Sequence, residues 1–399
     1  MRILVISSKM PYPPRDGGAI ATLNLVLGLA RAGHDTSLFV LNTRKHYFPP
    51  DQVPDRITRE ITLHSTSIDT SVRPAELIRN LLFSRAPYIA TRFYDPNVEK
   101  ELRRLLKKET YDVIQLEGPY LASYIPAIRS ESRARIALRA HNTEHEIWQR
   151  KARGERRPFH KLYLQNLASR VKQFEKQCLD SVNMVIPISD RDNDSLRSMG
   201  CRRPMMTIPA GLDISSYSPQ VPTLKGSLFF IGSLDWLPNQ EGLEWFMNRI
   251  IPLLCESHPK VQLHVAGRNA PDSLRQTLRH PNVVFHGEVD SARTFMQHYD
   301  IMIAPLLTGS GIRIKILEGM ALGKPIVTTS IGAEGIPAEN STHLMMANES
   351  RAFAGKIAQL LASPDLRQSL SEQAQQLIRE NFDTFVLSKR LADFYTQHI

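Results

Sequence analysis

The chain has 399 residues, too many for one hydrophobic core of ordinary size, so its length favours two or three domains. Its composition is that of a soluble globular protein, and no apolar run approaches the ~20 residues that cross a bilayer. The net charge is +10, so the chain is basic. Its three cysteines are scattered and form no CxxC pair, which argues against a disulfide framework or a zinc site. We therefore expect reduced thiols in a cytoplasmic protein.

The positive charge is concentrated in the first half of the chain. Residues 1–210 hold 34 Lys and Arg against 22 Asp and Glu, whereas the remainder holds 16 against 18. This asymmetry indicates a polyanion or an anionic membrane surface as a partner, with a solvated basic face as the alternative. Nucleic acid is not expected, because the basic residues do not alternate with aromatic residues in a known binding pattern.

The first half alternates short apolar runs with helical patterns, which is typical of βαβ units around a parallel sheet. Apolar spacing predicts a helix over residues 19–32 that ends at Gly33. The loop before it, residues 9–18, carries Gly17 and Gly18, where a ligand could approach the backbone closely. A turn that leads into the helix explains the same residues, and the two explanations are compatible. The strands expected in this half are residues 3–7, 36–41, 113–116, 136–139 and 184–187.

A turn-rich linker at residues 208–219 separates the halves, and the alternation then restarts. The strands expected in the second half are residues 227–231, 262–266, 283–285, 301–304 and 326–328. The expected helices are residues 240–256, 292–298 and 312–322, followed by a helical segment at 352–399.

This alternation predicts two doubly wound α/β domains. We assign residues 1–210 to an N-terminal domain and residues 211–380 to a C-terminal domain. The last segment, residues 381–399, is expected to be a helix that packs back towards the N-terminal domain. Ligand is expected in a cleft at the carboxyl ends of the strands.

Residues 309–325 are the most informative stretch, because they follow one apolar run and precede another, with a glycine-rich turn and a short helix between. The turn leaves backbone N–H groups at a helix N-terminus, where the helix dipole favours an anion. Arg313 and Lys315 add positive charge in the first helical turn, where helix stability alone would favour acidic residues. We interpret the stretch as a phosphate site.

The order of motifs along the chain resembles that of the retaining glycosyltransferases of family 4. The motifs are Gly17-Gly18, His141-Asn142 and residues 185–189, 208–213, 230–233, 265–267, 283–289 and 309–325. The resemblance covers nearly the whole chain. It implies the GT-B fold, in which two Rossmann-like doubly wound domains face a central cleft.

The resemblance also implies how the C-terminal domain holds a nucleotide-diphosphate sugar. Glu318 matches the second glutamate of the family's E-x7-E motif, which hydrogen-bonds the ribose hydroxyls in relatives; a surface helix glutamate is the alternative. Ser310 stands where the first glutamate of that motif is expected, which leaves the identity of the donor sugar open. Sugar contacts then fall to the turn that opens at Gly309, namely to Ser310 and the backbone N–H groups of Gly311, Ile312 and Arg313.

The cations that relatives carry after the first strand of this domain are absent from residues 232–242, which open with Gly232 and Ser233. The departing diphosphate must nevertheless be neutralised. Arg313 and Lys315 are the two candidates for this role, with Arg268 as a helper. On a helix, positions 313 and 315 point about 200° apart, so we expect only one of the two to face the phosphates. Lys315 ranks first because it lies three residues before Glu318 and shares its helix face, although an ion pair between the two is the alternative.

The resemblance places His141 beside the donor sugar as a catalytic residue, with a core histidine as the alternative. His141 and His145 could instead bind a metal, but the HExxH arrangement is missing, so no metal and no cofactor are expected. Asp190-Arg191-Asp192 matches a DxD metal motif, yet Ser189 and Asp192 have the spacing of a helix N-cap.

Two further segments carry weaker signals. Gly287 and Val289 are expected to contact the nucleobase, although a buried strand explains the same residues. Residues 73–85 form a basic amphipathic stretch that could lie on anionic lipid, with an ordinary surface helix as the alternative.

These features favour a retaining, metal-independent hexosyltransferase that moves sugar from a nucleotide-diphosphate donor to a glycan or polyprenyl-linked acceptor in exopolysaccharide or cell-surface synthesis. It is expected in the cytoplasm, on the inner face of the plasma membrane. The alternatives are a nucleotide-sugar 2-epimerase of the same fold and a non-enzymatic two-domain sugar-binding protein. A dinucleotide oxidoreductase is not expected, because no GxGxxG follows any predicted strand.

Overall fold

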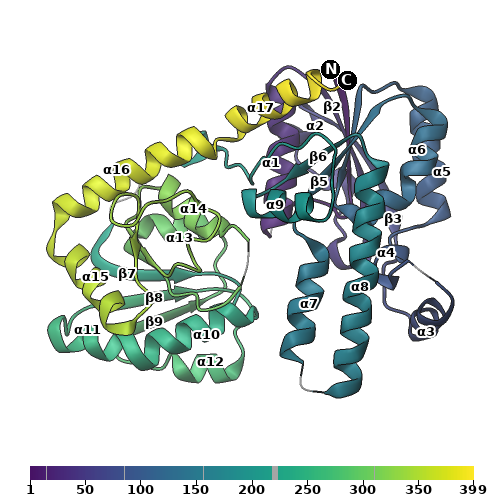
Figure 1. The fold of residues 1–399 in the computed structure, drawn as a ribbon. Helices are drawn as coiled ribbons and strands as arrows, with labels where there is room; N and C mark the ends of the chain where they lie inside the picture. The colour runs from purple at the N-terminus through teal and green to yellow at the C-terminus, as the bar shows by residue number, and fades with distance from the viewer. Residues whose placement is uncertain (15, 85, 156, 218–222, 310) are drawn as a thin grey trace. The chain divides into compact units, whose positions relative to one another are not determined.

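The structure, a computed structural model, describes residues 1–399 apart from Arg15, Arg85, Arg156, residues 218–222 and Ser310. It divides into two compact units (Figure 1). The N-terminal unit is Met1–Gly211 together with Thr384–Ile399, and the C-terminal unit is Leu212–Asp383. Each unit is built around a six-stranded sheet in which every strand pair is parallel, so the predicted fold class is confirmed.

The sheet of the N-terminal unit has the order β3-β2-β1-β4-β5-β6, which reverses direction at β1 as in doubly wound folds. Its strands are β1 (Arg2–Ser7), β2 (Asp35–Thr43), β3 (Thr62–Ile68), β4 (Val113–Glu117), β5 (Arg135–Ala140) and β6 (Met184–Pro187). The sequence analysis missed β3. This edge strand is only partly buried and reads TLHSTSI, so it lacks the apolar run by which the buried strands were found.

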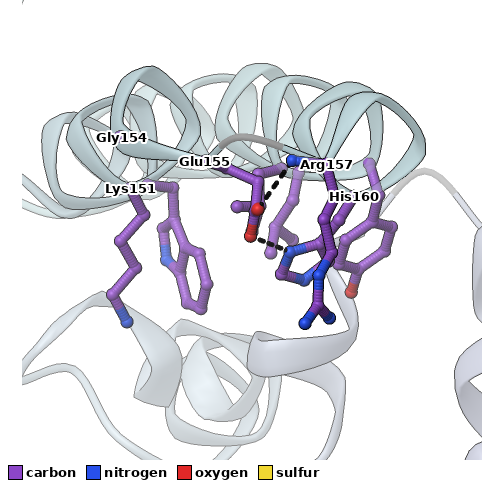
Figure 2. Close-up of a pocket in the computed structure, with 9 residues that line it drawn as sticks. Lys151, Gly154, Glu155, Arg157 and His160 are labelled. Carbon is purple, nitrogen blue, oxygen red and sulfur yellow. Dashed lines mark hydrogen bonds and ion pairs between the residues drawn. The ribbon is translucent and has the colours of Figure 1, made fainter.

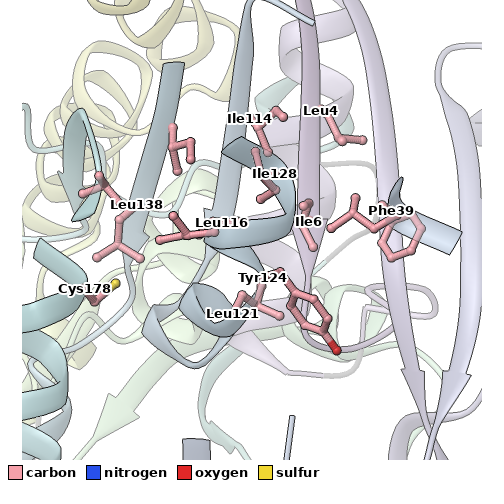
Figure 3. Packing of buried hydrophobic residues seen from close by; sticks show 14 of the residues in the cluster. Leu4, Ile6, Phe39, Ile114, Leu116, Leu121, Tyr124, Ile128, Leu138 and Cys178 are labelled. Carbon is pink, nitrogen blue, oxygen red and sulfur yellow. The ribbon is translucent and has the colours of Figure 1, made fainter. Parts of the chain in front are cut away.

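Helices cover both faces of this sheet. They are α1 (Gly17–Arg31), α2 (Asp55–Thr58), α3 (Pro74–Phe83), α4 (Tyr88–Thr91), α5 (Pro96–Lys108), α6 (Ile125–Glu131), α7 (Glu144–Gly154), α8 (Pro158–Ser181), α9 (Asp190–Ser198) and α17 (Thr384–Thr396), with short 3₁₀ turns η1 (Arg44–His46), η2 (Pro50–Gln52) and η3 (Pro119–Tyr124). Leu4 and Ile6 of β1 pack with α5, α6 and α8 on one face (Figure 3), whereas Ile3 and Val5 pack with α1 and α17 on the other.

The C-terminal helix α17 lies directly against α1, where Gly28 leaves room for it. A Cβ atom at Gly28 would lie 2.2 Å from Ser388 Oγ, so any side chain there would push the two helices apart. Leu387, Leu391 and Tyr395 of α17 are buried in the core of the N-terminal unit. The last helix is therefore an integral part of the N-terminal unit.

The sheet of the C-terminal unit has the order β12-β11-β10-β7-β8-β9. Its strands are β7 (Leu224–Ile231), β8 (Gln262–Ala266), β9 (Val283–Gly287), β10 (Tyr299–Ala304), β11 (Ile326–Thr328) and β12 (Met345–Met346). Its helices are α10 (Leu237–Trp245), α11 (Ile251–Ser257), α12 (Asp272–Thr277), α13 (Ala292–His298), α14 (Ile314–Ala321), α15 (Ser350–Ala362) and α16 (Pro364–Asn381), with η4 (Ile214–Ser216) and the π-helical turn η5 (Phe246–Ile250).

Two expected helices differ from the structure. The single helix predicted at residues 240–256 is three successive segments, because η5 intervenes just before Pro252, which has no N–H to continue the regular ladder. The helix predicted to begin at Ile312 begins at Ile314. Arg313 is its N-cap residue, with extended backbone dihedrals, so it stands before the first helical turn rather than inside it.

Within the described parts of the chain, no helix combines the length and the apolar character required to cross a membrane.

Candidate nucleotide-sugar and catalytic sites

In the C-terminal unit, the polar residues singled out from the sequence gather at the carboxyl ends of the parallel strands, where doubly wound sheets bind ligands. Lys315, the second residue of α14, is held there by Asn239 of α10. Its Nζ donates to Asn239 Oδ1 at 2.9 Å, and Asn239 Nδ2 donates to the Ser233 carbonyl at 2.7 Å. The buried amide of Asn239 thus fixes the ammonium group next to the loop after β7.

Gly232 makes this arrangement possible. A Cβ atom at Gly232 would lie 2.9 Å from Asn239 Nδ2 and 3.2 Å from Lys315 Nζ, so a side chain would displace both groups. Lys315 Nζ also lies 4.1 Å from the centre of the Phe230 ring. Burial, with a smaller contribution from the charge of Arg313, lowers the pKa of Lys315 to about 7. The ammonium group has three donors, and a bound diphosphate can accept those that Asn239 does not use.

Arg313 is placed differently from Lys315. Its guanidinium group is buried, lies 5.4 Å from the centre of the Trp236 ring, and donates from Nη1 to the Gly311 carbonyl at 2.7 Å. Gly309 and Gly311 both have positive φ, and a Cβ atom at Gly309 would lie 2.8 Å from Arg313 Nη2. Arg313 therefore braces the glycine loop from inside, and Ile312 packs its side chain against the core near Gly335.

Ser233 and Arg268 are also brought together. Arg268 Nε donates to Ser233 Oγ at 3.0 Å, and the Leu234 amide donates to the Arg268 carbonyl at 2.9 Å. Gly267 allows the loops after β7 and β8 to approach, because its own Cβ would lie 2.0 Å from the Gly232 carbonyl oxygen. The predicted helper cation thus lies beside the same loop as Asn239.

Glu318 faces a different partner from the one considered in the sequence. Tyr217 donates its hydroxyl hydrogen to Glu318 Oε1 at 2.9 Å, and the Arg293 guanidinium carbon lies 4.2 Å from the centre of the Tyr217 ring. Burial raises the pKa of Glu318, while the hydrogen bond from Tyr217 and the charge of Arg293 oppose that shift. Lys315 and Glu318 make no ion pair in the described chain, so that alternative is wrong.

Three further residues, Gly287, Val289 and Ser310, were expected to contact the nucleotide-sugar donor. Gly287 ends β9 with φ +70°, and its carbonyl accepts the Gly267 amide at 2.8 Å. Val289 is partly buried and packs against the core of the C-terminal unit, which is the ordinary role left open for it. Ser310 lies outside the described residues.

In the N-terminal unit, His141 follows β5 and is hydrogen-bonded to the buried carboxylate of Glu117 at the end of β4. His141 Nε2 lies 2.7 Å from Glu117 Oε2, which also accepts from Thr22 Oγ1 of α1 at 2.9 Å. The other carboxylate oxygen accepts from Gln115, and Gln115 in turn accepts the hydroxyl of Tyr395 from α17. A chain of buried hydrogen bonds thus connects the C-terminal helix to His141.

Glu117 is ionised despite its burial. Desolvation alone would raise its pKa, but the positive charge of Arg139 and the contacts with His141 and Thr22 outweigh it and lower the pKa to about 2. Arg139 lies opposite Glu117 in the β4–β5 ladder and is fully buried, with no hydrogen bond from its guanidinium nitrogens to the described residues. Its charge compensates Glu117 without a direct contact.

His141 and His145 have different carboxylate partners, Glu117 and Glu175. His145 is buried and its Nδ1 lies 2.8 Å from Glu175 Oε2, while the same carboxylate accepts the backbone amides of Glu144 and His145. Glu175 therefore caps the start of α7. The described residues contain no group of three potential ligands that could hold a metal ion. Ser189 caps α9 by accepting the Asp192 amide, as its spacing predicted.

Gly17 and Gly18 stand at the entry to α1, two residues earlier than the predicted start of this helix. Asp16 accepts the Ala19 amide at 2.9 Å and caps α1, so both glycines already belong to the first helical turn. The Asp16 carboxylate also pairs with Lys9 Nζ at 2.6 Å, and a Cβ atom on Gly18 would lie 3.5 Å from that nitrogen. Gly18 thus borders a Lys9–Asp16 ion pair.

Several residues at these sites were missed by the sequence analysis. They are Glu117, Tyr217, Trp236, Asn239 and Arg293. Only Glu117 had a usable signal, since a carboxylate at the end of an apolar strand is unusual. The others act through contacts between segments far apart in sequence.

The chain matches two family models. Residues 15–216 match the model described as "Glycosyltransferase Family 4", and residues 225–363 match "Glycosyl transferases group 1". A similar curated protein is the "Uncharacterized 44.6 kDa protein in cps region" of Klebsiella pneumoniae, 24% identical over 96% of this chain and 97% of that protein. The phosphatidyl-myo-inositol mannosyltransferase of Mycobacterium leprae is 24% identical over 76% of this chain and 78% of its own length.

Solved structures agree in fold. Sucrose-phosphate synthase from Thermosynechococcus elongatus matches with a TM-score of 0.72 at 15% identity, covering 100% of this chain and 98% of that one. Anabaena Alr3699/HepE in complex with UDP matches with a TM-score of 0.68 at 13% identity, covering 100% of both chains. The family model spans more than half of the chain, and the two parallel sheets have the GT-B architecture of these enzymes. The chain therefore belongs to glycosyltransferase family 4, whose members transfer sugar from a nucleotide donor.

Proposed function

We propose that this glycosyltransferase is a retaining, metal-independent enzyme that moves a hexosyl group from a nucleotide-diphosphate sugar to a glycan or lipid-linked acceptor in surface polysaccharide synthesis. The observation that carries the proposal is the position of Lys315. Asn239 holds its ammonium group beside Gly232, at the carboxyl end of the C-terminal sheet. A cation placed there can neutralise a diphosphate without a metal ion.

The C-terminal unit would hold the donor. Lys315 contacts the diphosphate, and the carboxylate of Glu318 accepts hydrogen bonds from the ribose hydroxyls. Tyr217 supports this role, because its hydroxyl occupies only one oxygen of Glu318 and keeps the carboxylate in place. Arg313 orders the loop at Gly309 and Gly311 from within rather than meeting the phosphates. Arg268, Ser233 and Gly287 are proposed to border the same site, with Val289 near the nucleobase.

The N-terminal unit would supply His141 to the reacting sugar. In the transfer, the bond from the anomeric carbon to the leaving phosphate breaks while the acceptor oxygen forms a bond on the same face. The proton of the acceptor hydroxyl passes to the leaving phosphate oxygen. This front-face route is favoured over a covalent intermediate because the carboxylate nearest His141, Glu117, is buried and engaged by three hydrogen bonds.

The acceptor and the setting are inferred from relatives and from charge. The Klebsiella relative is named for a cps region, and a 25% identical Escherichia coli relative is a "Putative colanic acid biosynthesis glycosyltransferase". The Mycobacterium relative is named for a lipid acceptor. We propose a cytoplasmic enzyme at the inner face of the plasma membrane, in keeping with three free cysteines and a basic N-terminal half.

The test is a thermal-shift and turnover screen with UDP-, GDP-, ADP- and dTDP-sugars. UDP-glucose comes first, because a solved relative was crystallised with that compound. The expected result is a higher melting temperature with one nucleotide and, with a membrane extract as acceptor, release of nucleotide diphosphate and labelled glycan. Epimerisation of the donor without acceptor would identify a 2-epimerase instead. Binding of sugar without turnover of any donor would identify a sugar-binding protein.

A further inference from the structure

Exposed apolar side chains gather on two elements of the N-terminal unit. The first is α3, where Ile78, Leu81 and Leu82 lie three and four residues apart and therefore share one helix face. Leu82 is 67% exposed, and Phe83 at the end of the helix is 84% exposed. We call Ile78, Leu81, Leu82 and Phe83 the α3 patch. No part of the described chain covers this face.

The second element is the turn between α7 and α8, a helical hairpin shown in Figure 1. Phe159 is 89% exposed and Leu162 is 66% exposed, and at a spacing of three they share a face of α8. Residues 150–161 contain six Lys and Arg and one acidic residue, Glu155, which pairs with His160. We call the described residues of this stretch, 150–155 and 157–162, the hairpin tip. Phe159, the most exposed of the large hydrophobic side chains in the described chain, thus follows closely on a basic stretch of sequence.

The hairpin tip is also hollowed. A groove of about 690 Å³ is lined by residues of both helices. Figure 2 shows Lys151, Arg157 and His160 among the side chains that line it. Lys151 Nζ lies 4.6 Å from the centre of the Trp148 ring, which forms part of the groove wall. The lining combines apolar side chains, such as Trp148 and Leu164, with the cations Lys151 and Arg157, and such a mixture suits a group that is anionic at one end and apolar at the other.

A smaller cavity with the same character adjoins the α3 patch. It has a volume of about 490 Å³ and is lined by Arg79, Arg92 and Phe83 among others. Arg79 is exposed, and Nε of Arg92 is buried without a hydrogen bond to the described residues. Two guanidinium groups beside an exposed phenylalanine match a phosphate next to acyl chains.

A single arginine of α8, Arg170, connects this helix to α3. Arg170 of α8 donates from Nη2 to the backbone carbonyls of Asn80, Ser84 and Ala86, at 3.1, 2.6 and 2.8 Å. It therefore holds the end of α3 against α8. Phe159 lies eleven residues earlier on the same helix, or roughly 16 Å along its axis. The α3 patch and the hairpin tip thus belong to one unit, in which Arg170 joins the end of α3 to the helix that carries Phe159.

We propose that the α3 patch and the hairpin tip together dock the enzyme on an anionic phospholipid bilayer. The apolar side chains enter the acyl boundary, and Lys151, Arg157 and Arg79 bind lipid phosphates. Charge favours the bilayer over a second copy of this chain, because pairing two hairpin tips would bring ten cations of the described residues together. The purpose of such docking rests on the proposed transfer of sugar to a membrane-bound acceptor. The experiment that tests the docking does not depend on that proposal.

The experiment is co-sedimentation of the full chain with vesicles of phosphatidylcholine containing about 30% phosphatidylglycerol. Binding should exceed that to pure phosphatidylcholine vesicles and should fall as salt screens the cations. The pairs Phe159→Ser with Leu162→Ser, and Leu82→Ser with Phe83→Ser, should each lower the partition coefficient about tenfold. The triple change Lys151→Gln, Arg153→Gln and Arg157→Gln should remove most of the preference for the anionic vesicles.

Matched controls separate docking from general damage. Tyr47→Ser with Leu224→Ser removes two exposed apolar side chains elsewhere, and Arg104→Gln, Lys107→Gln and Lys108→Gln removes three exposed cations of α5. Both should bind vesicles like the wild type. Equal binding to both vesicle types, or equal losses in the controls, would overturn the proposal. So would a wild-type dimer that the patch variants convert to monomer.

The vesicle measurement requires neither donor nor acceptor, so the two proposals fail separately. A protein that docks but turns over no nucleotide sugar contradicts the reaction alone. A protein that transfers sugar but ignores anionic vesicles contradicts the docking surface alone.

Discussion

Glu117 fixes the orientation of His141, because its Oε2 lies 2.7 Å from His141 Nε2 and its low pKa keeps it ionised. An ionised carboxylate can only accept, so Nε2 of the imidazole carries a proton. Nδ1 of His141 makes no hydrogen bond to the described residues and is the nitrogen left to meet a ligand. Glu117 is therefore a positioning residue for the proposed catalytic histidine.

Glu117→Gln should lower kcat by about 10–100-fold, because the amide no longer holds His141 in one tautomer. KM for the nucleotide sugar should stay within about twofold, since the donor is bound by the C-terminal unit. Steady-state kinetics at several pH values measure kcat and KM. The nitrogen chemical shifts of His141 by NMR report its tautomer. Glu60→Gln, which removes a surface partner of Arg31, is the control. A variant with normal kcat and a changed His141 tautomer would show that the tautomer is irrelevant to turnover.

Lys315→Ala should reduce kcat/KM more than Arg313→Ala does. Lys315 is held by one hydrogen bond and can still donate to a diphosphate, whereas Arg313 is buried against Trp236. A loss of about 100-fold is expected for Lys315→Ala, the size associated with one removed charge stabiliser. Arg313→Ala should instead lower the melting temperature. The opposite order of activity losses would assign the diphosphate to Arg313.

Nucleotide binding should weaken as pH rises above about 7, because the pKa of Lys315 is lowered to about 7. The diphosphate favours the charged ammonium, so binding raises that pKa and takes up a proton when the pH exceeds it. Calorimetric titration of nucleotide diphosphate in buffers of different ionisation enthalpy should show proton uptake near pH ~8 and none near pH ~6. Lys315→Met should abolish this uptake, and persistence of the uptake in the variant would point to another group.

Glu318→Gln should weaken nucleotide diphosphate binding by roughly tenfold or more, since hydrogen bonds to a charged acceptor exceed those to a neutral one. The same change should equalise the affinities for ribose and 2′-deoxyribose nucleotides, which differ in the wild type. Tyr217→Phe is the companion variant, because it frees Glu318 Oε1 while leaving the carboxylate charged. Wild-type discrimination by Glu318→Gln would remove the ribose contact from Glu318.

The sequence predicted the sheets better than the site. Buried parallel strands such as β1 and β10 are continuous apolar runs, so they are recognisable without tertiary information. The edge strand β3 and the break at η5 were missed, because β3 is only partly buried and the break occurs next to Pro252, which has no N–H for the helical ladder.

For the candidate site, the sequence supplied only those residues that local spacing can single out. Lys315 and the glycines after β10 could be chosen from one short segment, yet the partner of Lys315 lies 76 residues away at Asn239. The expected pairing of Lys315 with Glu318 used helix geometry alone and missed Tyr217, which is 101 residues from Glu318. Such partners follow from strand order, which the sequence did not specify.

His264 should make the C-terminal unit sensitive to acid. Its ring stacks on Tyr299 at 4.1 Å between centres, and burial, followed by the neighbouring charge of His286, lowers its pKa to about 4. The unfolded chain takes up this proton below about pH 6.5, whereas the folded chain does so only below about 4. The free energy of unfolding should therefore fall on acidification between these values, by on the order of 3 kcal/mol.

Urea unfolding at several pH values in this window measures how steeply the free energy of unfolding falls with pH. His264→Phe should reduce this slope while keeping the ring stacked on Tyr299. His280→Gln, on the surface loop before β9, should leave the slope unchanged. Glu117 causes a separate loss of stability, but only below about pH 4.5. Its pKa is lowered to about 2 in the folded chain, so the unfolded chain takes up this proton first as the pH falls. An unchanged slope in His264→Phe would mean that another group takes up the proton.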